Sequence, residues 1–161
     1  MSTNVKSEFD TPEWHAHRDQ LLLSWVQDPH AVQLIVLLGE TAEVWDDLID
    51  ADKPVSKDRL NRLFTALLTE LPLNPFFDKF KVQLTPLLLV GINAWHDANV
   101  LEKGSDNDKA IAYVLRDWYV ELVMFITCLT RGYTKMREHS LEIRRFFSQH
   151  ESLPAYMEKL Q

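Results

Sequence analysis

The sequence predicts an all-α protein, a compact bundle of five or six helices in a single domain. Glycine accounts for only four of 161 residues. Asn-Gly and Asp-Gly pairs, the usual hairpin turns, are also few, which argues against a β-rich fold. Apolar residues instead recur at three- and four-residue spacings. Three dipeptides, Thr11-Pro12, Asp28-Pro29 and Asn74-Pro75, each place a capping side chain before a proline at the first helical position.

These signals assign the helices in order along the chain. The expected helices are residues 12–26, 29–50, 56–71, 75–102, 109–131 and 134–150, followed by a short tail from 152–154 onward. Residues 1–10 are polar and are expected to form a flexible N-terminus, so the single helical domain is residues 11–161.

Prolines and apolar runs refine this assignment. Pro72 is expected to end the third helix, and Pro86 to kink the fourth. The fourth and fifth helices are apolar on nearly every face, so both are expected near the centre of the bundle.

Charge and cysteine content limit the functional classes. The formal net charge is −7, which argues against nucleic acid as a partner, because binding to a phosphate backbone depends on Lys and Arg. Cys128 is the single cysteine, so it cannot form an internal disulfide and favours a cytoplasmic location. We expect no membrane association, because no signal sequence opens the chain and no apolar run reaches the roughly 20 residues of a membrane span.

The second expected helix carries an acidic stripe within an otherwise hydrophobic segment. Its members are Glu40, Glu43, Asp46, Asp47 and Asp50. Four of them, at positions i, i+3, i+7 and i+10, fall on one helical face, an arrangement that suits Mg²⁺, which prefers oxygen ligands. The alternative is the solvated side of an amphipathic helix. No Lys or Arg stands between these acids, so they repel one another, which favours a metal site.

Further acidic groups lie on the later helices. Asp117 and Glu121 are one turn apart on the apolar fifth helix, where a carboxylate needs a metal, a proton shared between the two, or a cation such as Arg116. Asn93, His96 and Asp97 gather near the end of the fourth helix, either as a polar site or as an ordinary helix terminus.

The segment Asp46-Asp47-Leu-Ile-Asp50 resembles the first aspartate-rich DDxxD motif of class I isoprenoid synthases. That resemblance implies an all-helical fold and a substrate diphosphate held through Mg²⁺ by the aspartates. A weaker likeness links Glu40 and Glu43 to the ExxE pair of MazG-like all-helical nucleoside triphosphate pyrophosphatases. Both resemblances imply Mg²⁺ and a diphosphate-containing ligand.

The expected function is therefore Mg²⁺-dependent binding of a diphosphate-containing small molecule, with its hydrolysis or ionisation left open. The metal ligands would be the five acids of the stripe, completed by Asp117 and Glu121. The alternative is a non-enzymatic helical interaction protein, either a homodimer or an acidic inhibitor or adaptor, whose stripe binds a basic protein partner.

A group of basic residues near the end of the chain has two possible interpretations. Its members are Arg131, Lys135, Arg137, Arg144 and Arg145. They are either receptors for a phosphate or an acidic partner, or a solvated helix face balanced by Glu138 and Glu142.

Overall fold

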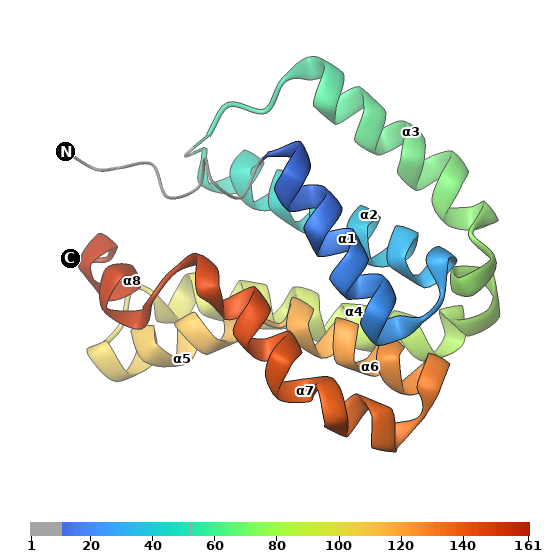
Figure 1. Ribbon diagram of the computed structural model, residues 1–161. Helices are drawn as coiled ribbons and strands as arrows, with labels where there is room; N and C mark the ends of the chain where they lie inside the picture. Colours follow the sequence, from blue (N-terminus) through green and yellow to red (C-terminus); the bar gives the residue numbers. More distant parts are fainter. Residues whose placement is uncertain (1–10, 52) are drawn as a thin grey trace. The chain divides into compact units, whose positions relative to one another are not determined.

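The computed structural model describes residues 11–51 and 53–161, and these residues form helices and no strands (Figure 1). In chain order the elements are α1 (Pro12–Val26), α2 (Pro29–Asp50), α3 (Lys57–Leu73), α4 (Pro75–Leu101), α5 (Asp106–Arg116), α6 (Tyr119–Arg131), α7 (Tyr133–Phe147), a 3₁₀ turn η2 (Ser148–His150) and α8 (Leu153–Lys159). The all-α prediction is confirmed. The flexible N-terminus expected at 1–10 lies outside the described residues.

The predicted starts of α1 and α2 are confirmed by their caps, whereas α5 begins at Asp106, three residues before the expected start at 109. The Thr11 side chain accepts the amide of Trp14, and Asp28 accepts the amides of His30 and Ala31. Ser105 and Asp108 form a reciprocal capping box at the start of α5. Each cap satisfies amides that the first helical turn leaves without a partner.

The described residues divide into two contact units. One unit is 28–85, with α2, α3 and the first part of α4. The other comprises residues 11–27 together with 86–161. The expectation of a single domain stays a prediction.

In the unit of residues 28–85, α2 and α3 contact each other. Asn74 also ties the start of α4 to α2, because its side-chain amide donates to the His30 carbonyl at 2.9 Å. Its Oδ1 accepts the amide of Phe77 and so caps α4. A proline just before the end of α3, Pro72, does not stop that helix as predicted. The helix continues to Leu73, because a proline so near the end interrupts only the last turn.

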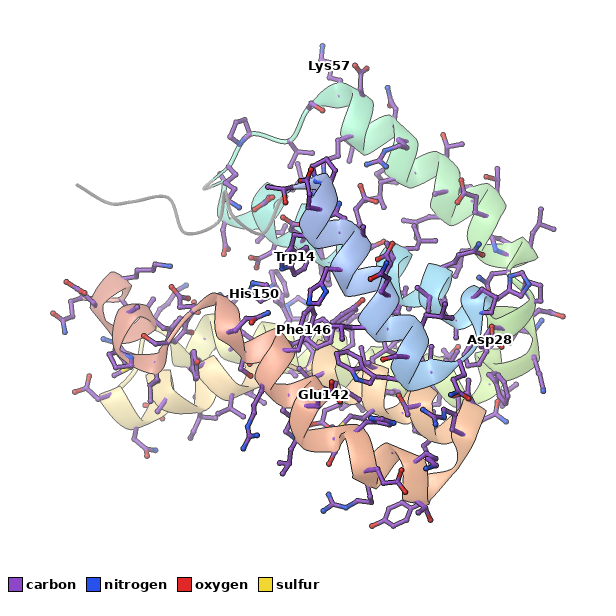
Figure 2. All side chains as sticks on the ribbon, in the orientation of Figure 1. Trp14, Asp28, Lys57, Glu142, Phe146 and His150 are labelled. Atoms are coloured by element: carbon purple, nitrogen blue, oxygen red, sulfur yellow. The ribbon has the colours of Figure 1, made fainter. Side chains whose placement is uncertain are left out.

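In the other unit, α6 packs against both α7 and α1 (Figure 1). The side chains that α6 buries are Val120, Leu122, Val123, Met124, Ile126 and Thr127. An aromatic cluster joins α1 to α7, in which Phe146 stacks on Trp14 with ring centroids 6.0 Å apart (Figure 2). The second part of α4 buries Ala98 against Ala112 and Tyr156, but leaves other apolar side chains exposed.

The prediction of one continuous fifth helix is wrong, because the structure has two helices there, α5 and α6. The helical path is interrupted at Asp117 and Trp118, where the amides of both residues reach back three positions, to the Val114 and Leu115 carbonyls. The break lets the Trp118 indole lie against Gly91 of α4, where no side chain competes for the space.

Candidate functional site

The acidic stripe of α2 faces arginines of α3, which together form the α2–α3 charge cluster. Its members are Glu40, Glu43, Asp47, Arg59 and Arg62. The helices are joined as an antiparallel hairpin, so residues early in α3 lie beside residues late in α2. Ser56 fixes the start of α3 by accepting the Arg59 amide at 3.1 Å.

Arg59 is the centre of this cluster. Its Nη2 donates to Glu43 Oε2 at 3.1 Å, its Nε lies 3.8 Å from Glu40 Oε1, and its Nη1 lies 3.8 Å from Asp47 Oδ2. The planar guanidinium suits this arrangement, because its donors point in several fixed directions. One cation thereby offsets the mutual repulsion of three carboxylates on adjacent turns.

Exposure differs sharply among the carboxylates. The Asp47 side chain is 5% exposed, whereas that of Glu43 is 57% exposed. A buried Asp requires polar or charged partners, because the loss of hydration is costly. Glu40 lies between these extremes and also accepts a hydrogen bond from Arg62 at 2.5 Å.

The remaining stripe residues, Asp46 and Asp50, lie on the same helix. Asp46 is partly buried and Asp50 is exposed. Within residues 11–51 and 53–161, no group of three or more His, Cys, Asp or Glu side chains is arranged to hold a metal ion. In the arrangement seen, the carboxylates of the cluster are engaged by guanidinium groups instead.

Asp117 and Glu121 belong to the other unit, where their partners are Ser148 and Arg144. Asp117 ends α5 and accepts a hydrogen bond from the Ser148 hydroxyl at 3.0 Å. Burial raises the pKa of its carboxyl, and the Ser148 hydrogen bond opposes this only in part. Glu121 is not enclosed by apolar groups, because its side chain is 52% exposed and pairs with Arg144 at 2.8 Å.

The polar residues of α4 form local contacts. The Asn93 side-chain amide donates to Asp97 Oδ2 at 2.9 Å, one turn further along the helix. His96 lies with its ring edge-on to Trp95. Asn93 and Asp97 are both exposed.

Sequence reasoning missed the partners of two carboxylate groups. Arg59 and Arg62 have the same three-residue spacing as Glu40 and Glu43, and this match was the available signal. In the other unit, Glu102 accepts hydrogen bonds from Arg116 and from the Tyr156 hydroxyl. Burial alone would raise the pKa of Glu102, but these donors and the charge of Arg116 hold it below its usual value.

Comparisons with known proteins identify no relative of this chain. No protein-family model matches the chain, and neither a curated protein nor a solved structure matches it. None of the helices in the described part of the chain combines the length and apolar character of a bilayer-crossing segment.

Proposed function

We propose that the protein binds a diphosphate-containing small molecule together with Mg²⁺ at the α2–α3 charge cluster. The carboxylates of Glu40, Glu43 and Asp47, extended by Asp46 and Asp50, would hold the metal. Arg59 and Arg62 would move from these carboxylates to the phosphate oxygens. We also propose that the protein is located in the cytoplasm.

One observation carries the proposal: three carboxylates and two arginines lie together on adjacent turns of two helices. Magnesium is commonly held by one or two carboxylates plus substrate phosphates. Arginine recognises phosphate through paired hydrogen bonds. The cluster contains both kinds of group, so binding would exchange internal ion pairs for pairs with the metal and the diphosphate.

The same geometry requires that metal and diphosphate bind together. Mg²⁺ alone would have to separate the carboxylates from Arg59 without giving that guanidinium a new anion. Inorganic pyrophosphate alone would approach a cluster with more carboxylates than arginines. Mg²⁺ and pyrophosphate together give the carboxylates a new cation and the arginines a new anion. The participation of Asp117 and Glu121 stays a prediction.

Thermal unfolding tests this proposal with Mg²⁺, inorganic pyrophosphate, and both together. At a ligand concentration about 100 times Kd, binding adds about 2.7 kcal/mol to the unfolding free energy. That corresponds to a Tm increase of about 5–11 °C for a domain of this size. The combination should raise Tm more than the sum of the separate effects, and Glu43→Gln with Asp47→Asn should remove the increase.

Glu138→Gln is the matched control, because Glu138 pairs with Lys135 on α7, in the other contact unit. It should leave the increase unchanged. Absence of any Tm change at millimolar Mg²⁺ and pyrophosphate would refute the proposal.

A second candidate is a non-enzymatic interaction protein whose stripe binds a basic protein partner. The observation that favours it is that guanidinium groups already occupy Glu40, Glu43 and Asp47. An arginine-rich peptide should then bind, and Glu43→Gln should weaken that binding. A homodimer would appear as a doubled mass in analytical ultracentrifugation. Neither result is expected from the Mg²⁺ proposal.

A further inference from the structure

The outer face of α7 carries a row of side chains at four-residue steps, here called the α7 ladder. Its members are Tyr133, Arg137, Leu141 and Arg145. Four-residue steps place side chains along one side of a helix, and the row extends for about 18 Å. Tyr133 is 67% and Leu141 62% exposed. The row therefore alternates large exposed apolar groups with arginines.

The ladder is fixed in place by the opposite face of α7. That face buries Ser140 and Ile143 and packs against α6. Phe146 contacts Trp14 and Trp25 of α1, and the Phe146 and Trp14 side chains point toward each other in Figure 2. Because these contacts set the rotation of α7, the ladder is held outward.

The other basic groups near α7 are already engaged. Lys135 pairs with Glu138 at 2.6 Å. Arg131 donates to the Ser24 and Trp25 carbonyls and so satisfies the last turn of α1.

The ladder arginines are not neutralised in this way. Within the described part of the chain, the Arg145 guanidinium has no ion pair or hydrogen bond, and Arg137 reaches only the Ser140 hydroxyl, at 3.5 Å. Arg144, beside the ladder, pairs with Glu121 but remains half exposed. The exposed acids of α7, Glu138 and Glu142, offset two of its four exposed Lys and Arg side chains, so α7 keeps an excess of positive charge on a protein whose net charge is −7.

We propose that the α7 ladder is a docking surface for an acidic segment of another protein. Carboxylates of that segment would pair with Arg137 and Arg145, since guanidinium groups bind carboxylates through paired hydrogen bonds. Apolar side chains of the segment would cover Tyr133 and Leu141. This surface is separate from the α2–α3 charge cluster and does not depend on the function proposed there.

The charge of the whole protein favours this partner over two others. Nucleic acid and anionic lipid surfaces carry dense negative charge over long distances, and a protein of net charge −7 is repelled by them. A short acidic segment carries fewer charges over a shorter length, so the same net charge repels it less, and salt screens the charges that lie more than about 10 Å from it.

Fluorescence polarisation tests the proposal with a fluorescein-labelled helical peptide of about 15 residues, which has glutamates and leucines at four-residue steps. The peptide should bind saturably, and binding should weaken as salt increases. Arg137→Ala combined with Arg145→Ala should weaken it about tenfold. Leu141→Ala should weaken it about threefold.

Lys135→Ala is the control, because this lysine lies on another face and is paired with Glu138. Its peptide affinity should equal that of the unmodified protein. The proposal is overturned if the double arginine variant binds as well as the parent, or if a peptide with Gln in place of Glu does so. Tighter binding to a single-stranded oligonucleotide of equal charge, or to phosphatidylserine vesicles, would also overturn it.

Discussion

Replacing Gly91 by Ala should destabilise the protein, although the same change usually stabilises a helix. Gly91 lies inside α4, where Ala is favoured over Gly by about 1 kcal/mol when space is available. A Cβ at this position would lie 2.5 Å from Cζ3 and 2.6 Å from Cδ2 of the Trp118 indole. Carbon atoms in contact prefer separations of about 3.5–4.0 Å.

The magnitude follows from the difference between these two effects. Forcing extra volume into a packed site typically costs about 1–3 kcal/mol. The rigid indole ring should place Gly91→Ala in the upper part of that range. After subtraction of the gain in helix propensity, a net loss of about 1–2 kcal/mol remains. For a domain of this size, Tm should fall by about 2–8 °C.

A double-mutant cycle with Trp118→Leu, followed by urea denaturation, isolates the contact. In the Trp118→Leu background the ring is absent, so Gly91→Ala should be neutral or stabilising. The coupling energy should therefore be about 1.5 kcal/mol or more. If Gly91→Ala raises Tm in the parent protein, the packing of Trp118 against α4 is refuted.

The remaining predictions concern the charged groups. Arg59→Met should lower the unfolding free energy by about 1–2 kcal/mol, because Asp47 is buried beside Arg59. Arg62→Met should lower it by only about 0.5 kcal/mol, because the Arg62 side chain is 69% exposed. Urea denaturation measures both changes. For Asp117, the raised pKa means that the folded state binds a proton more readily than the unfolded state, so this group's contribution falls as pH rises above about 4. Asp117→Asn should accordingly gain stability relative to the parent at pH 7 and lose the gain near pH 4, and equal differences at both pH values would contradict this. For Glu102, the lowered pKa gives stability that is present above its unfolded pKa and is lost as pH falls through the folded pKa. Tyr156→Phe removes one of its hydrogen bonds and should cost about 1 kcal/mol at pH 7, with a smaller difference in acid, measured by thermal unfolding against pH.

The sequence predicted most of the fold because helix starts depend on local chemistry. Thr11, Asp28 and Asn74 cap helices through side chains that reach their own next turn. The interruption at Trp118 was not predictable in this way. It accompanies a contact of the Trp118 ring with Gly91, which lies 27 positions earlier in the chain and leaves space for that ring. Residues so far apart leave no trace in the local periodicity.

The same limit applies to the candidate site. The stripe was evident from spacing alone, and the lack of Lys or Arg within it favoured a metal. Pairing between helices supplies another explanation for the stripe, because Arg59 brings a cation from the next helix, and the metal stays a proposal. Repulsion within one helix therefore predicts that a partner exists, without specifying whether that partner is a metal or an arginine.

Arg59 gives the means to separate a structural role of the stripe from a ligand-binding role. If the ion pairs serve only to hold α2 and α3 together, Arg59→Met should lower stability and leave the protein indifferent to Mg²⁺ and pyrophosphate. If the cluster binds both ligands, two effects compete in this variant. The carboxylates lose the cation that competes with Mg²⁺, while pyrophosphate loses a partner. The response to Mg²⁺ alone should then grow relative to the parent, while the extra response to pyrophosphate shrinks. A stability loss with neither change in response would leave the stripe with the structural role alone.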